Sequence, residues 1–121
     1  MQVTRKMVEA MDPRPTRPYQ WRITKDLLDT TGKHCRVGVS GPHNPDPALD
    51  TLKGKAFQSA PHAVKFRMSD DDRNVYYEGW IAGEFEGFEP LNDFGTADAG
   101  CVIIELWEKD RKTGTWKWCI L

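Results

Sequence analysis

Residues 63–83 read AVKFRMSDDDRNVYYEGWIAG, and this stretch decides the fold class. In its first six residues Val64, Phe66 and Met68 alternate with lysine and arginine, which is the period-two pattern of a strand with one buried face. Residues 74–83 are rich in aromatic and β-branched side chains, and the acidic SDDDRN between the two segments has the composition of a turn. The stretch therefore predicts an antiparallel β-hairpin.

Strand patterns continue on both sides of this hairpin. Four further segments show alternating, β-branched or aromatic composition: 19–24, 35–41, 101–107 and 115–121. Residues 44–57 predict one short helix, with Asp46 as its N-cap and Pro47 at its first position. We therefore predict an α+β, mainly β domain: an antiparallel sheet of about six strands, rolled or closed into a partial barrel, with one or two short helices.

The length of 121 residues suits a single hydrophobic core. We predict an N-terminal helix or extended arm over residues 1–17 and one β-rich domain over residues 18–121. The chain has neither the ~18 consecutive apolar residues of a membrane span nor a signal-peptide pattern, so we expect a cytoplasmic protein without a membrane partner. Cys101 and Cys119 stand in apolar runs, which predicts buried thiols and no disulfide framework.

The charges are unevenly distributed, although the formal net charge is only -1. Residues 69–98 hold nine acids and one base, whereas residues 1–36 hold eight bases and four acids. One interpretation is that these segments offset each other within the fold, through exposed pairs that contribute about 0–1 kcal/mol each. The other interpretation is an acidic surface that docks the basic surface of a protein partner, anchored by aromatic rings.

Residues 84–98, EFEGFEPLNDFGTAD, predict a long loop that packs against the domain as a flap. Loops of more than about 12 residues without secondary structure are commonly functional or mobile. The candidate binding residues are the rings and acids of this flap and of the strand before it: Tyr76, Trp80, Glu84, Phe85, Glu86, Phe88, Glu89 and Asp93. The alternative interpretation is that Phe88, Leu91 and Phe94 plug one end of a small barrel.

Several other motifs carry no site. Asp70, Asp72 and Asn74 alternate like calcium ligands, but Val75 and Ile81 stand where such a loop needs Gly and Glu, so a hairpin turn is the better interpretation. No pair of histidines has a metal-ligating spacing. We expect no metal and no cofactor. The densest rings lie among acids that repel phosphate, which argues against nucleic acid as a partner.

The stretches FRMSDDDRNVYYEGW and FEPLNDFGTADAGC also carry a resemblance. The chain resembles a group of small bacterial proteins without an assigned function, of the accessory type carried on mobile elements. The resemblance covers roughly residues 18–118, and its specific part is residues 66–100. It implies a compact β-rich domain, and it transfers no catalytic residue.

The leading functional hypothesis is a non-enzymatic binding module, an accessory or inhibitor protein that recognises a protein partner through the flap and Trp80. A small-ligand-binding β-barrel is the first alternative, with four rings lining its mouth: Tyr76, Trp80, Phe85 and Phe88. A weaker alternative is an acid/base hydrolase using Glu84, Glu86 or Asp93.

Residues 115–121 raise the question of oligomerisation, because both faces of this strand are partly apolar. Such a strand fits a covered central position in the sheet, or an edge position paired across a homodimer.

Overall fold

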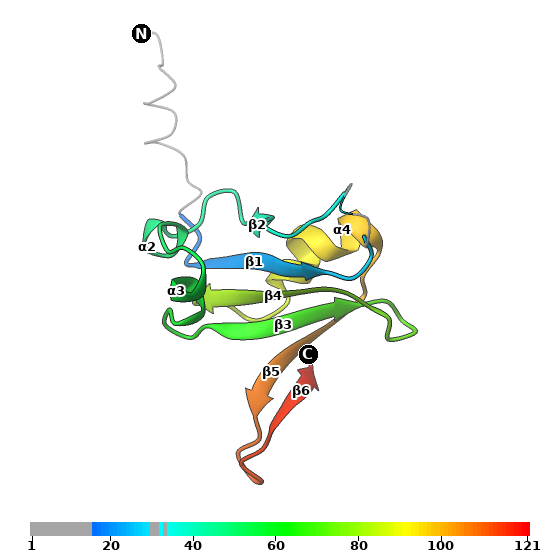
Figure 1. Ribbon diagram of the computed structural model, residues 1–121. Helices are drawn as coiled ribbons and strands as arrows, with labels where there is room; N and C mark the ends of the chain where they lie inside the picture. The colour runs from blue at the N-terminus through cyan, green and yellow to red at the C-terminus, as the bar shows by residue number, and fades with distance from the viewer. Residues whose placement is uncertain (1–15, 30–31, 33) are drawn as a thin grey trace, which may run out of the picture.

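A six-stranded antiparallel sheet forms the body of the protein (Figure 1). The structure is a computed structural model that describes residues 16–29, 32 and 34–121, so the predicted N-terminal arm lies mostly outside the described residues. The strand order is β2-β1-β4-β3-β5-β6. The strands are β1 (Tyr19–Asp26), β2 (Ser40–Gly41), β3 (Val64–Ser69), β4 (Val75–Gly83), β5 (Ile103–Lys109) and β6 (Trp116–Ile120). The sheet stays open and does not close into a barrel, which agrees with the rolled-sheet form of the predicted fold class.

The helices are shorter than the sequence patterns predict. They are α2 (Pro47–Asp50), α3 (Lys55–Gln58), the π-helix η1 (Leu91–Gly95) and α4 (Thr96–Ala99). The prediction of one helix over residues 44–57 is therefore wrong. Gly54 adopts φ +55, a positive value that a continuous right-handed helix does not accommodate. The flap was also expected to lack secondary structure, and η1 and α4 correct that expectation. Of the predicted strand 35–41, only Ser40–Gly41 forms a strand, although Gly38 and Val39 also make backbone hydrogen bonds to Ile23 of β1.

Each face of the sheet buries its own apolar cluster. The main core combines sheet residues with residues of the segment that covers them: Trp21, Ile23, Phe66, Met68, Tyr77, Ile81, Ile104 and Leu106 from the strands, with Leu91 and Cys101. On the other face a smaller cluster of Leu49, Phe57 and Ala82 lies under α2 and α3. Figure 1 shows η1 and α4 (yellow) and the pair α2 and α3 (green) as separate covers. Among the residues that the structure describes, no helix covers the rest of the second face.

The three cysteines are free thiols. Cys101 is fully buried as predicted, and this burial raises the pKa of its thiol to about 11. Cys119 is only partly buried because β6 is an edge strand. The edge position also shows that the covered, central placement of residues 115–121 is wrong. Pairing of this edge across a homodimer stays a prediction.

At Gly79 of β4 the two neighbouring strands leave no room for a side chain. Gly79 pairs with Ile23 of β1 on one side and with Phe66 of β3 on the other. A Cβ atom at position 79 would lie 2.1 Å from the carbonyl oxygen of Arg22 and 2.6 Å from the tip of the Phe66 ring. Glycine thus lets β1 bulge after Ile23 while the Phe66 ring covers the bare backbone of β4.

We expect Gly79→Ala to lower the free energy of unfolding by about 3 kcal/mol, because the added methyl group meets backbone that is fixed in the β1–β4 ladder. Urea unfolding followed by circular dichroism measures the change. Val102→Ala, at a residue that is 56% exposed, is the matched control and is expected to stay within about 0.5 kcal/mol of the parent. Equal midpoints for the two variants would contradict this account of β4.

Candidate functional site

The predicted binding residues do not share one surface. On β4, Tyr77 and Ile81 belong to the main core, and successive side chains of a strand alternate between its faces, so Trp80 lies on the opposite face. Phe85 packs against the main core, on the face that the flap covers. The flap and Trp80 are therefore on opposite sides of the sheet, and the expected barrel mouth lined by both is absent from the described residues.

Most rings of the flap face the sheet. The Phe94 ring lies 5.5 Å from the Trp21 ring and 5.2 Å from the Tyr77 ring, measured between centroids. Leu91 is only 8% exposed, whereas Phe88 is 41% exposed. Phe94 and Leu91 pack on the core, as the alternative interpretation expects, but they cover a face of an open sheet and not the end of a barrel. Phe88 is the large apolar side chain that the flap leaves in solvent.

Aspartates of the acidic segment accept hydrogen bonds from ring donors of the core. Asp93 Oδ2 accepts from the indole N–H of Trp21 at 2.9 Å and from the hydroxyl of Tyr19 at 3.1 Å. Asp98 accepts from the hydroxyl of Tyr77. Burial, followed by the charge of Asp93, raises the pKa of Tyr19 to about 12, and burial with the Asp98 hydrogen bond raises the pKa of Tyr77 as well. Acids therefore stand among rings in this sequence because they satisfy the polar ends of those rings.

The turn between β3 and β4 uses its acids in the same way. Asp70, Asp71 and Asp72 place carboxylate oxygens within 4.8 Å of one another. Asp70 accepts from two backbone N–H groups, from the amide of Asn74 and from the hydroxyl of Tyr76 at 2.8 Å. The hydrogen bonds from Asn74, followed by that from Tyr76, lower the pKa of Asp70. The cluster is thus a hydrogen-bonded turn held together by its own donors.

The glutamates of the flap have separate surroundings. Glu89 accepts from the backbone N–H groups of Glu86 at 2.8 Å and Gly87 at 2.7 Å, so its carboxylate closes a local turn. Glu84 and Glu86 are exposed. Within the flap these acids are therefore surface and turn groups, and Asp93 is engaged with the rings of β1.

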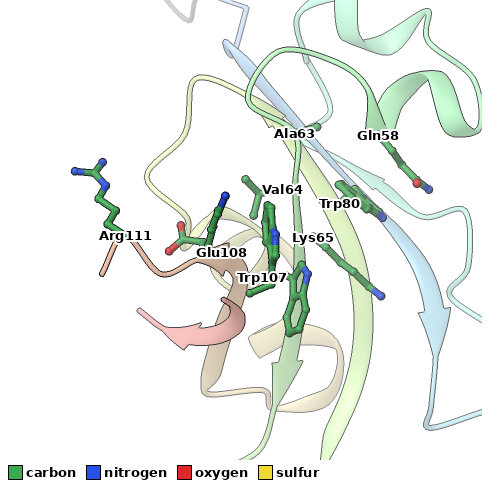
Figure 2. Close-up of a pocket in the computed structure, with 10 residues that line it drawn as sticks. Gln58, Ala63, Val64, Lys65, Trp80, Trp107, Glu108 and Arg111 are labelled. Carbon is green, nitrogen blue, oxygen red and sulfur yellow. The ribbon is translucent and has the colours of Figure 1, made fainter. Parts of the chain in front are cut away.

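The uncovered part of the second face carries tryptophans that sequence reasoning did not assign to a site. Trp107 is 36% exposed and Trp116 is 57% exposed. The β5–β6 register places Trp107 opposite Trp118, with ring centroids 5.2 Å apart. Trp107 and Trp116, together with Trp80, border a groove of about 820 Å³ (Figure 2). We name it the tryptophan groove; it is lined by Gln58, Ala63, Val64, Lys65, Trp80, Trp107, Glu108, Lys109, Arg111 and Trp116.

The tryptophan groove lies where two neighbouring strands part. β3 and β5 pair from Phe66↔Leu106 to Ser69↔Ile103. Continuing this register would pair Lys65 with Trp107, Val64 with Glu108 and Ala63 with Lys109, and all six residues line the groove instead. In Figure 1 the β5–β6 hairpin (orange and red) leans away from β3. We name the gap between residues 63–65 and 107–109 the fork.

An ion pair closes the inner end of the fork. Arg67 donates from two nitrogens to the two carboxylate oxygens of Glu105, at 3.0 and 3.1 Å, and Arg73 lies 3.5 Å from the same carboxylate. Glu105 is 3% exposed, and paired, charge-assisted hydrogen bonds of this type are strong and directional. The Arg67 guanidinium also lies 4.3 Å from the centre of the Trp118 ring, within cation–π range. The Arg67 guanidinium and the Trp118 ring are thereby held in place beside the groove.

The groove has an excess of positive charge. The ammonium group of Lys65 lies 3.4 Å from the carboxylate of Glu78. In contrast, no carboxylate of residues 16–29, 32 and 34–121 lies within 4.0 Å of the charged nitrogens of Lys109 or Arg111. Glu108 is the one acid among the lining residues, which include no hydroxyl, thiol or imidazole. The groove is therefore equipped to bind an anionic group beside apolar rings, and it assembles no nucleophile–base pair of the usual kind.

No family model, curated protein or solved structure matches this chain, so the function is argued from the groove itself. In the part of the chain that the structure describes, no helix is long and apolar enough to cross a bilayer.

The three tyrosines give a pH-dependent prediction. All have pKa values raised above 10.0: Tyr19 and Tyr77 mainly by burial, and Tyr76 mainly by its hydrogen bond to Asp70. Because the folded state holds these protons more tightly than the unfolded chain, the stabilisation is complete below pH 10 and is lost as the pH rises towards about 12. We expect less than half of the tyrosine to be ionised at pH 10 in a near-ultraviolet absorbance titration. The urea-unfolded chain is expected to reach half ionisation there, at about pH 10, and equal curves for the two states would refute the prediction.

The exposed tryptophans can be tested by quenching. We expect iodide to quench the tryptophan fluorescence more efficiently than caesium when each is measured relative to its quenching of N-acetyltryptophanamide, because Lys109 and Arg111 line the groove with Trp107 and Trp116 and attract the anion. Replacing both cations with glutamate is expected to reverse the order of the two quenchers. Trp116→Phe identifies the share of the most exposed ring. Equal relative efficiencies of iodide and caesium in the parent protein would show that the groove has no net positive field.

Proposed function

We propose that the protein is a non-enzymatic protein-binding module that holds an acidic partner in the tryptophan groove. One observation carries the proposal: exposed tryptophans on two strands line the same groove as two cations, Lys109 and Arg111, that have no carboxylate within 4.0 Å in the described part of the chain. Tryptophan and arginine are the side chains that most often dominate protein–protein binding energy. Complementary charge then raises the association rate and the specificity.

The proposal keeps the class of function that the sequence predicts and changes the surface. Rings of the flap pack on the core, so Phe88 is the main apolar anchor that an acidic flap could offer a basic partner. The tryptophan groove offers more exposed aromatic surface, and its charge favours an acidic partner. An accessory or inhibitor role is consistent with a small domain whose groove contains no assembled catalytic group.

Single-stranded nucleic acid is a second candidate. The fold brings Trp107 and Trp116 beside Lys109 and Arg111, and stacking rings with flanking cations are what a nucleic-acid strand requires. The sequence argument against nucleic acid rested on the rings of residues 76–94, several of which belong to the core. The acids of residues 69–98 still oppose a polyanion at longer range, and for this reason we rank a protein partner first.

A direct comparison of two probes tests the proposal. The first is a fluorescein-labelled peptide of about eight residues in which glutamate alternates with phenylalanine or valine, and the second is an oligothymidylate of about eight nucleotides. We expect the peptide to bind more tightly than the oligonucleotide in fluorescence anisotropy. Trp107→Ala and Trp116→Ala are each expected to weaken peptide binding by about tenfold.

Phe88→Ala is the matched control, because it removes an exposed ring from the opposite face. It is expected to leave peptide binding unchanged, and thermal melting checks that each variant is folded. Loss of binding in Phe88→Ala alone would assign binding to the flap. Tighter binding of the oligothymidylate would favour the nucleic-acid candidate.

A further inference from the structure

Because β3 and β5 separate at the fork, their facing backbone edges are open to a partner. We infer that the partner enters the fork as a short extended strand, whose backbone hydrogen-bonds to the free edges of residues 63–65 and 107–109. This inference rests on the proposed function and specifies the binding mode and the chemistry of the bound segment: an acidic strand that also carries apolar or aromatic residues.

The backbone edges of β3 and β5 that face the fork do not pair with each other. In an antiparallel ladder, alternate residues of a strand direct N–H and C=O groups to each neighbour. On one side of each strand this pairing is complete, because Lys65 pairs with Trp80 and Trp107 pairs with Trp118. On the side that faces the fork, the pairing stops at Phe66↔Leu106, with no further pair among the described residues. The N–H of Ala63 donates to the carbonyl of Ala60 at 3.1 Å, so the free groups on the β3 side are those of Lys65 and the carbonyl of Ala63. Free edges of this kind are templates for an added strand.

Aromatic and basic side chains follow one another along the fork. From the closed end outward, the β5 side presents first Trp107, then Lys109 and, in the following turn, Arg111. Trp80 and Lys65 stand on the other side of the groove. An inserted strand would therefore place an apolar or aromatic side chain between the tryptophans and a carboxylate near the two cations at the mouth.

The unpaired edges of the fork are short. Three residues on each side of the fork would continue the ladder, and a strand rises about 3.3 Å per residue, so the paired stretch is about 10 Å long. This length suits a linear segment of a few residues. A single-stranded nucleic acid can stack on the rings, but it has no use for two rows of peptide N–H and C=O groups. The fork thus favours a polypeptide over a nucleic acid.

Matched peptides separate strand insertion from docking by side chains alone. The probe is the alternating glutamate–phenylalanine peptide described above, together with two derivatives that are N-methylated at every second amide, one in each register. Methylation keeps the side chains and the charge and removes the ladder donors. We expect at least one methylated derivative to bind about tenfold more weakly than its parent, because strand addition depends on main-chain hydrogen bonds.

Amide hydrogen exchange of the unaltered protein supplies the second measurement. Bound parent peptide is expected to slow exchange at fork-facing amides within residues 63–65 and 107–109, while amides in the turn between β3 and β4 exchange at their previous rates.

The outcomes distinguish the inference from the proposed function. If all three peptides bind equally and the amides in the fork exchange at an unchanged rate, the partner docks through side chains, and strand insertion is wrong while the proposed function stands. If the parent peptide does not bind at millimolar concentration, the inference and the acidic-partner proposal both fail. Tight binding of oligothymidylate alone would replace both with the nucleic-acid candidate.

Discussion

The ion pair between Arg67 and Glu105 connects the two parts of the sheet. Within the sheet, the β5–β6 hairpin joins the other four strands through β3 alone, and Arg67↔Glu105 is one of only four paired positions there. A nearly buried carboxylate is costly unless it is paired, so Glu105 needs Arg67 to stay in place. The same guanidinium stacks on Trp118. One interaction thereby joins the hairpin to the sheet, fixes the closed end of the fork and orders the neighbouring tryptophan.

The acids of this chain have different partners on the two faces of the sheet. Asp93 and Asp98 lie on the covered face, where they bind the polar ends of Trp21, Tyr19 and Tyr77. The other face carries bases that pair internally, as Lys65 does with Glu78, and the groove carries bases with no carboxylate within 4.0 Å in the described part of the chain. The first interpretation of the charge pattern therefore holds for part of the charge, as in the pairs Arg36–Asp98 and Lys65–Glu78, whereas the docking of a basic partner by an acidic surface stays a prediction.

The fold could be predicted from local patterns, whereas the site could not. Alternation in residues 63–83 predicts β3, β4 and the turn between them, and the structure confirms all three because one buried face imposes period two. The tryptophan groove depends on strand order and register. Trp80 and Trp107 are far apart in sequence, and only the order β4-β3-β5 places them on the same groove. The assignment of Phe85 and Trp80 to one surface failed for the same reason, since nothing local shows which face a following segment covers.

An open fork is a hazard for a small β protein, because unpaired edges also attract other copies of the same chain. Lys65 and Lys109 stand on the two sides of the fork, and Arg111 follows at its mouth. Two forks brought together would therefore meet with the same sign of charge, and such repulsion disfavours pairing between identical copies. The outer edge of β6 differs, since Lys117 is bound there to Asp110 at 2.9 Å. A homodimer would thus form more readily at that edge than at the fork, and the cations that oppose self-association at the fork are the same ones that select an acidic strand.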